Sequence, residues 1–208
     1  MEFRILSPGD LSELLELQLK VYDALENKEV LQTLSESEFA QIIEQGFILG
    51  AYEAGRLVGS RSMYVPSVGE EGHLADDVGI KDKKSVIYSE ITFIDPGKRG
   101  RGMQTAMGKE LIEKVRKERR FENILTTVMP ENIPSLKDKF RLGFKILKTT
   151  YKYNGKKRHI MHLGLNHPFE PKGQAEKIHF SDTDWMMTKG NTFIGSSFDG
   201  EHIYYYPK

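Results

Sequence analysis

The stretch that decides the fold reads IDPGKRGRGMQ and runs from Ile94 to Gln104. It joins an apolar run that starts at Ser85, predicted to be a strand, to an amphipathic run from Met103 to Arg120, predicted to be a helix. The first N–H groups of a helix have no partner within the helix and lie at the positive end of its dipole. Glycines let the main chain approach a phosphate closely. The sequence therefore predicts an anion site where the strand enters the helix.

The composition is typical of a soluble globular protein, with 38% hydrophobic and 29% charged residues among 208. This length is enough for one domain with a substantial core and an appendage. The formal net charge is zero, which argues against a dedicated nucleic-acid binder, because such proteins neutralise phosphates with excess positive charge. The chain has no cysteine, which excludes disulfides, cysteine nucleophiles and thiolate metal sites.

Neither a targeting segment nor a membrane span is expected. The first residues, MEFRILSP, lack an apolar signal core. No window approaches the roughly 18 apolar residues that a membrane span requires. The default expectation is a cytoplasmic protein with no membrane partner.

Hydrophobic periodicity, capping signals and turn residues predict the other elements. Asp10 with Glu13, and Ser35 with Glu38, are expected to form capping boxes that start two helices. Residues 26–34 are expected to be a charged connection, and residues 66–83 a mobile loop. The remaining expectations are a strand over 2–6, helices over 10–25 and 35–46, strands over 47–53, 57–65 and 124–129, a helix over 132–142, and a hairpin over 145–165 that turns at Asn154-Gly155.

Residues 166–208 differ from the rest of the chain. They begin with a polar connection rich in proline and continue into an expected second hairpin, Thr192–Phe198 with Glu201–Tyr206, around Asp199-Gly200. The segment is too short to fold alone. We interpret it as a C-terminal appendage that docks on the main domain.

The turn at Ile94–Gln104 resembles the acetyl-CoA pyrophosphate loop of the GNAT N-acetyltransferases, and the order of the expected elements is similar to that of the family. The resemblance implies an α/β (α+β) chain with the GNAT acyl-CoA N-acyltransferase fold, a mixed, mostly antiparallel central sheet flanked by helices. It implies an acetyltransferase domain over residues 1–165 and a small C-terminal β appendage over residues 166–208.

The resemblance also implies a binding site for acetyl-CoA. Main-chain N–H groups of the loop hold the pyrophosphate in the family, and the pantetheine arm pairs with exposed main chain of the preceding strand. Gln104 departs from the glycine or alanine that is usual at its position, so its long side chain could crowd the phosphates or add an amide donor. The positions in this sequence are Phe93, Ile94, Arg99, Gly100, Arg101, Gly102, Met103, Gln104 and Thr105.

A second motif is similar to a later segment of the family. Asn132-x-x-Ser135, followed by Leu142-Gly143-Phe144, matches the family's Asn-x-x-Ala segment and the Gly-Phe that ends it. The resemblance implies that Asn132 contacts the pantetheine arm, although the same residue also fits a helix N-cap. The family's tyrosine, a general acid toward the CoA thiolate, is replaced by Lys139. Lys139 either donates this proton or is a solvated helix lysine.

The acceptor amine must lose a proton, because an alkyl ammonium group has a pKa near about 10.4. Glu90 is the candidate general base, acting directly or through water. Strand alternation places it on one face with Thr92 and Ile94. The alternative is a strand carboxylate that pairs with a lysine or arginine.

Several other sites are excluded or left open. Gly102 to Lys109 has the wrong spacing for a P-loop, and His159 and His162 face opposite sides of a strand, so no metal site is expected. The basic cluster Lys152, Lys156, Lys157 and Arg158 is either a solvated hairpin or a docking site for a CoA phosphate or an acidic partner. Trp185 and Tyr204–Tyr206 either pack the appendage or extend the acceptor pocket.

Three functions remain in competition. The first is an N-acetyltransferase that transfers the acetyl group of acetyl-CoA directly to a primary amine of a small molecule or peptide. The second is a CoA-binding sensor or regulator of the same fold with weak catalysis. The third is an RNA- or partner-binding module that uses the basic cluster. The family makes a homodimer plausible, and the identity of the acceptor is left open.

Overall fold

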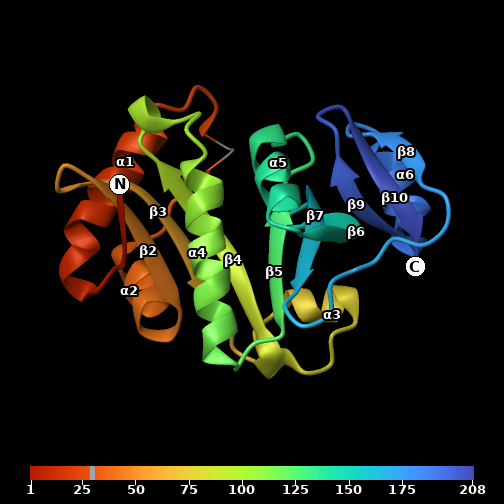
Figure 1. Ribbon diagram of the computed structural model, residues 1–208, viewed down its shortest axis with the longest axis horizontal. Helices are drawn as coiled ribbons and strands as arrows, with labels where there is room; N and C mark the ends of the chain where they lie inside the picture. The colour runs from red at the N-terminus through yellow and green to blue at the C-terminus, as the bar shows by residue number, and fades with distance from the viewer. Residues whose placement is uncertain (29–30) are drawn as a thin grey trace. The chain divides into compact units, whose positions relative to one another are not determined.

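The structure is a computed structural model that describes residues 1–28 and 31–208 (Figure 1). The connection expected over 26–34 includes Glu29 and Val30, which lie outside the described residues. The chain divides into two compact units. The first unit comprises Met1–Val65 and Tyr88–Glu118, and the second comprises Pro66–Ile87 and Arg119–Lys208.

The first unit carries the antiparallel strand order β1-β2-β3-β4. Its α-helices and strands follow the order predicted from the sequence. The hairpin between β2 and β3 turns at Ala54 and Gly55, which both have positive φ. The elements are β1 (Glu2–Ile5), η1 (Pro8–Asp10), α1 (Leu11–Asp23), α2 (Glu36–Gln45), β2 (Phe47–Glu53), β3 (Arg56–Tyr64), β4 (Val86–Ile94), η4 (Pro96–Lys98) and α4 (Met103–Glu118).

Helices cover both faces of the sheet in the first unit. Helices α1 and α2 bury Leu14, Phe39 and other apolar side chains against Ile48, Tyr52 and Phe93 of the strands. Helix α4 packs on the opposite face, where a Cβ at Gly59 would lie only 2.7 Å from the sulfur of Met103. The absence of a side chain at Gly59 therefore lets the first turn of α4 approach β3 closely.

The second unit carries the antiparallel strand order β5-β7-β6-β9-β10-β8. Asn132 is the N-cap of α5, and Gly143 follows the helix in the left-handed conformation, as expected. The elements are α3 (Leu74–Val78), η3 (Lys83–Ser85), β5 (Asn123–Val128), α5 (Ile133–Arg141), β6 (Lys145–Lys152), β7 (Lys156–Gly164), β8 (Glu176–His179), α6 (Thr183–Thr188), η5 (Gly190–Thr192), β9 (Phe193–Phe198) and β10 (His202–Pro207).

The C-terminal hairpin extends the sheet of the second unit. Strand β9 pairs with β6 through Ile146 and Gly195, and the hairpin of β9 and β10 is the one predicted from Asp199-Gly200. Trp185 of α6 packs against Phe193 and Tyr205, with ring centroids 5.4 and 5.1 Å away. Tyr205 is buried, so packing rather than acceptor contact accounts for its ring. Strand β8 and helix α6 were not predicted from the sequence.

Two local expectations were wrong. Asp10 and Glu13 form no capping box, because the Asp10 carboxylate accepts hydrogen bonds from Ser7 and pairs with Arg4 at 2.6 Å. The capping box at Ser35 and Glu38 is confirmed. The segment over 66–83 was expected to be a loop but contains α3, whose N-terminus is capped by the ring of the buried His73.

With mostly antiparallel sheets flanked by helices, the predicted fold class is confirmed. Among the described residues, none of the helices has the length and apolar character needed to cross a membrane.

His159 on β7 is completely buried, and its Nδ1 lies 2.9 Å from the hydroxyl of Thr149. Burial lowers the pKa of His159 to about 3, whereas an unfolded histidine has a pKa of about 6.5. The native state therefore keeps a neutral ring where the unfolded chain binds a proton. Because the unfolded state binds more protons, acid favours unfolding between these two pKa values.

We predict that the free energy of unfolding falls by up to about 1.4 kcal/mol per pH unit through His159 as the pH drops from about 6.5 toward 4. The variant His159→Gln should lose this part of the slope, whatever its stability at pH 7. Urea unfolding at several pH values measures the slopes, and His167→Gln is the control because His167 is exposed. Equal slopes for His159→Gln and the unchanged protein would contradict the prediction.

Candidate functional site

The turn between β4 and α4 has the geometry of an anion-binding loop. After β4, the Asp95 carboxylate accepts a hydrogen bond from the N–H of Gly97 at 2.9 Å. Asp95 is thus the N-cap of the short helix η4. Gly100 and Gly102 have φ values of 77° and 73°. A Cβ added at either glycine would have no neighbouring atom within 4 Å. Glycine is therefore required here by the backbone conformation, and the loop is open around both residues.

The main-chain donors of this turn are available to a ligand. Within the described part of the chain, the N–H groups from Arg99 to Gln104 donate no hydrogen bond to a protein acceptor, and the first bond into the helix runs from Ala106 to the carbonyl of Gly102 at 3.0 Å. The residues from Arg99 to Gly102 are exposed. Helix α4 has 16 residues, so its dipole adds positive potential at this end. The turn can therefore bind a phosphate or diphosphate.

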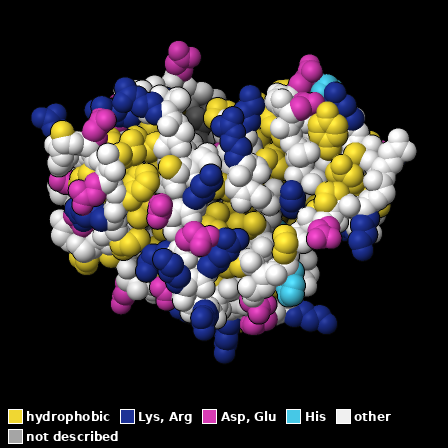
Figure 2. Space-filling view, viewed as in Figure 1, with side chains coloured by type: hydrophobic (Ala, Val, Ile, Leu, Met, Phe, Trp, Pro, Cys, Tyr) yellow, Lys and Arg dark blue, Asp and Glu magenta, His cyan; other side chains and the backbone are white. Residues whose placement is uncertain are grey.

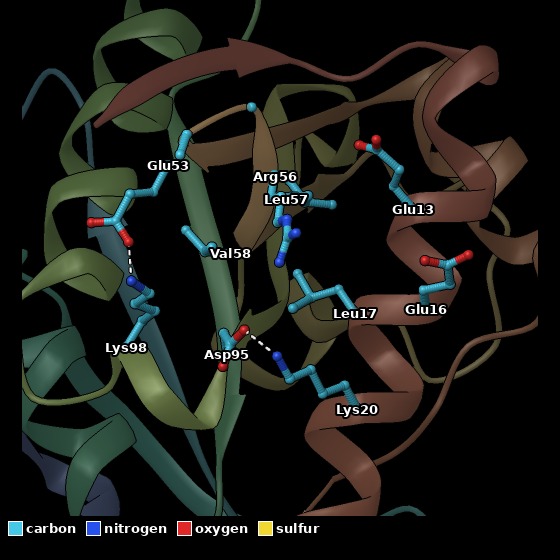
Figure 3. Close-up of a pocket in the computed structure, with 12 residues that line it drawn as sticks. Glu13, Glu16, Leu17, Lys20, Glu53, Arg56, Leu57, Val58, Asp95 and Lys98 are labelled. Atoms are coloured by element: carbon cyan, nitrogen blue, oxygen red, sulfur yellow. Dashed lines mark hydrogen bonds and ion pairs between the residues drawn. The ribbon is translucent and has the colours of Figure 1, made fainter.

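Two ion pairs hold the start of the turn. Lys20 of α1 lies 2.6 Å from Asp95, and Lys98 pairs with Glu53 of β2 (Figure 3). The hydrogen bond from Lys20 lowers the pKa of the Asp95 carboxyl, so the pair persists at neutral pH. Both pairs line an open groove of about 960 Å³, which contains none of the residues from Arg99 to Gln104. The groove therefore lies beside the two ion pairs at the start of the turn, and the N–H groups from Arg99 to Gln104 do not line it.

Arg61 on β3 is a charged residue of this region that was not predicted from the sequence to belong to the site. Its side chain is only 1% exposed. Its Nη1 donates to the carbonyl of Gln104 at 2.9 Å, and its Nη2 donates to the hydroxyl of Ser89 at 3.4 Å. The sequence does contain a signal for this residue, because Arg61 is a charged residue within a strand whose neighbouring residues are apolar or small.

Glu90 lies at an irregularity of β4. Thr92 pairs with Arg61 and Ser89 pairs with Met63, so Glu90 and Ile91 together face the single residue Ser62. This arrangement is a β-bulge, and the Ser62 hydroxyl bonds both the N–H and the carbonyl of Ile91. The expected alternation from Glu90 to Thr92 and Ile94 is therefore wrong, because the extra residue breaks the period of two. The Glu90 side chain is exposed.

The other predicted cofactor residues of the first unit surround the turn. Phe93 pairs with Ser60 and Ile94 with Gly59 in the ladder to β3, and the Phe93 ring packs on Phe39. Met103 is buried beneath the turn, while Gln104 and Thr105 are half-buried in the first turn of α4. The candidate residues from Glu90 to Thr105 are thus contiguous along β4, the turn and α4.

Three predicted site residues lie in the second unit, on α5. Asn132 accepts a hydrogen bond from the N–H of Ser135 at 3.1 Å, which confirms it as the N-cap. Lys139 is 5% exposed, and its ammonium lies 5.4 Å from the ring centroid of Phe144. The alternative of a solvated helix lysine is therefore wrong. A buried cation over an aromatic face has the chemistry of a proton donor or an anion stabiliser.

The basic cluster of the β6–β7 hairpin is partly occupied by protein contacts. Lys152 pairs with Asp77 at 2.7 Å, and Lys157 donates to the hydroxyl of Thr183 at 2.7 Å. Among the residues that the structure describes, no cluster of three potential metal-ligating side chains is found.

No family model matches the sequence, and no curated protein is similar to it by sequence. Solved structures are similar to it in fold. A putative acetyltransferase from Salmonella typhimurium, yncA, solved with its cofactor acetyl-CoA, has a TM-score of 0.60 at 15% identity and covers 83% of this chain and 98% of its own.

The ribosomal-protein-S18-alanine N-acetyltransferase from Escherichia coli has the same TM-score of 0.60 at 16% identity, over 83% of this chain and 98% of its own. A ribosomal-protein-alanine N-acetyltransferase from Brucella melitensis has a TM-score of 0.57 at 21% identity, over 79% and 99%. The chain therefore has the fold of the GNAT acetyltransferases, as the resemblance in its sequence predicted.

Proposed function

We propose that this protein is an N-acetyltransferase that transfers the acetyl group of acetyl-CoA to a primary amine by direct attack while both substrates are bound. The observation that carries the proposal is the turn from Arg99 to Gln104, whose N–H groups donate to no protein acceptor in the described chain. The fold supports it, because solved structures that share the fold are acetyltransferases.

The residues present fit a CoA diphosphate. The turn offers adjacent main-chain donors at a helix N-terminus, two glycines without crowding, and the exposed cations Arg99 and Arg101. Main chain of Phe93 and Ile94 would pair with the pantetheine arm. Thr105 of the first unit is also assigned to the cofactor. In the second unit Asn132 and Ser135 are assigned to it, with the Asn132 side-chain amide oriented by its bond to Ser135.

Two side chains are assigned to proton transfer. Glu90 takes the proton of the acceptor ammonium, through water because its carboxylate is exposed. The neutral nitrogen then attacks the thioester carbonyl carbon and the C–N bond forms. The nitrogen loses its second proton to water, and the C–S bond breaks. Lys139 gives a proton to the departing thiolate, and its burial strengthens this electrostatic role.

Two departures from the family's pattern favour the second candidate, a CoA-binding sensor or regulator. Lys139 stands where the resemblance implies a tyrosine, and Gln104 stands where a glycine or alanine is usual. Native mass spectrometry of the purified protein for bound CoA, followed by an amine screen that reads free thiol, separates the two functions. CoA binding with no turnover on any amine would favour the sensor.

The nucleic-acid hypothesis has the least support. Lys152 and Lys157 are engaged by Asp77 and Thr183. Figure 2 shows basic and acidic side chains interspersed on the visible face, in keeping with a formal net charge of zero. Binding to RNA that falls steeply with salt would revive this hypothesis.

We propose that residues 1–165 form the acetyltransferase domain and residues 166–208 a C-terminal extension attached through β9. The acceptor is a small molecule or a peptide amine, the setting is cytoplasmic, and a homodimer is compatible with the fold.

We predict that Gly102→Asp weakens CoA binding by at least about a hundredfold, because it places negative charge and bulk beside the diphosphate. Isothermal titration with CoA measures the affinity. Gly79→Asp is the matched control, since Gly79 has a φ of 75°, close to the 73° of Gly102, and equally open surroundings. Both variants carry the same backbone strain. Unchanged CoA affinity in Gly102→Asp would count against the proposed site.

We predict that Glu90→Gln lowers kcat/KM for the amine by about a hundredfold near pH 7. The deficit should shrink as the pH approaches about 10, because a growing share of the amine is then neutral without a base. A pH profile of initial rates with the best acceptor from the screen provides the measurement. A deficit that is constant from pH 7 to pH 10 would remove Glu90 from the role of base.

A further inference from the structure

Among the described residues, Arg61 has the largest fully buried side chain, and this side chain ends in a charged guanidinium. It lies on β3, two residues from Gly59, and therefore on the face of the sheet that α4 covers. Removing a guanidinium from water costs free energy that only well-placed hydrogen bonds and charges offset. A cation of this kind inside a strand calls for a physical role beyond filling space.

Two hydrogen bonds of Arg61 join the first turn of α4 to β4. Nη1 donates to the carbonyl oxygen of Gln104 at 2.9 Å, and Nη2 donates to the hydroxyl of Ser89 at 3.4 Å. The Gln104 carbonyl belongs to the same helical turn whose N–H groups face the proposed diphosphate. Ser89 directly precedes the bulge at Glu90 and Ile91. One side chain thus connects the anion-binding turn with the bulged strand.

The charge of Arg61 has a second consequence. The guanidinium of Arg61 and the N-terminus of α4 both carry positive charge, so both attract an anion. A dianion bound at the turn would be attracted by the helix dipole and by the guanidinium through a medium of low dielectric constant. The arrangement therefore favours the anion-bound form of the turn.

We infer that Arg61 is a positioning residue for the diphosphate-binding turn: it fixes the first turn of α4 against β4 and adds buried positive charge beneath the anion. This inference rests on the proposed function for its ligand, but the fixing of the turn does not depend on that ligand. Arg61 is not assigned any contact with the substrates.

The test compares Arg61→Gln, Arg61→Lys and Ser89→Ala, with Arg116→Gln as the control. Glutamine keeps a hydrogen-bond donor and removes the charge, whereas lysine keeps the charge. Arg116 is an exposed arginine near the other end of α4 that pairs with Glu113. Hydrogen exchange of peptides that cover residues 99–110 reports the fixing of the turn without any ligand. Titration with CoA, and separately with inorganic pyrophosphate, reports anion affinity.

We expect Arg61→Gln to speed exchange in the peptides over residues 99–110 more than in those of α1 and α2, and to weaken CoA binding about tenfold or more, as for loss of a charged hydrogen bond. Arg61→Lys should recover the affinity to within about threefold, and Ser89→Ala should speed exchange over 99–110 to a smaller extent. Arg116→Gln should match the unchanged protein in both measurements.

Arg61→Gln with unchanged exchange and unchanged CoA affinity would overturn the inference. Equal losses of CoA affinity in Arg61→Lys and Arg61→Gln would also overturn it. The lysine variant keeps the positive charge, so equal losses would mean that the charge does not contribute to anion binding. If Arg61→Gln does not fold, the lysine and Ser89→Ala variants decide the outcome by the same two measurements. If the protein without substitutions binds neither CoA nor pyrophosphate, the proposed function is wrong. The hydrogen-exchange data would still test whether Arg61 fixes the turn.

Discussion

The function proposed for this protein depends on main-chain donors at one helix N-terminus that the protein itself leaves unpaired. A helix cannot satisfy its own first N–H groups, and most helices cap them with side chains. Helix α2 follows that rule, because Ser35 and Glu38 close a capping box. Helix α4 differs, since the donors from Arg99 to Gln104 find no acceptor within the described chain. The two helix starts within one unit therefore differ: α2 has a side-chain cap, and α4 has the proposed binding turn.

The surrounding fold holds this turn from several sides. Gly59 lets Met103 approach the sheet, Lys20 pairs with Asp95, and Arg61 holds the carbonyl of Gln104. Exposed ion pairs contribute little free energy individually, so the close packing and the buried hydrogen bonds carry most of the positioning. The donors are thus arranged before any ligand arrives, and a preorganised site loses little entropy on binding.

The sequence predicted the elements whose conformation depends on a few neighbouring residues. The glycine turn, the Ser35–Glu38 cap and the hairpin at Asp199-Gly200 each depend on backbone rules that act over a few residues. The sequence did not reveal the bulge at Glu90, because a bulge exists only in the register between two strands. It did not reveal Arg61 or the burial of Lys139 either, since both depend on partners distant in sequence. The helices α3 and α6 are too short for periodicity to identify them.

The C-terminal extension shows the same division between local and distant information. Its hairpin was predictable, but its attachment through Gly195 to Ile146 of β6 was not. A Cβ at Gly195 would lie 3.0 Å from Ile146 and 3.1 Å from the Tyr205 ring, so a residue without a side chain lets Tyr205 pack there. The aromatic side chains that suggested a substrate role therefore serve largely as the core of the extension.

An NMR titration of the ¹⁵N-labelled protein with CoA observes the main-chain N–H groups of the turn themselves, and so tests whether they bind the diphosphate. We expect the largest amide shifts within Arg99–Gln104, and we expect inorganic pyrophosphate at higher concentration to reproduce part of them. Saturation with CoA that leaves these amides unshifted, while residues elsewhere respond, would contradict the account.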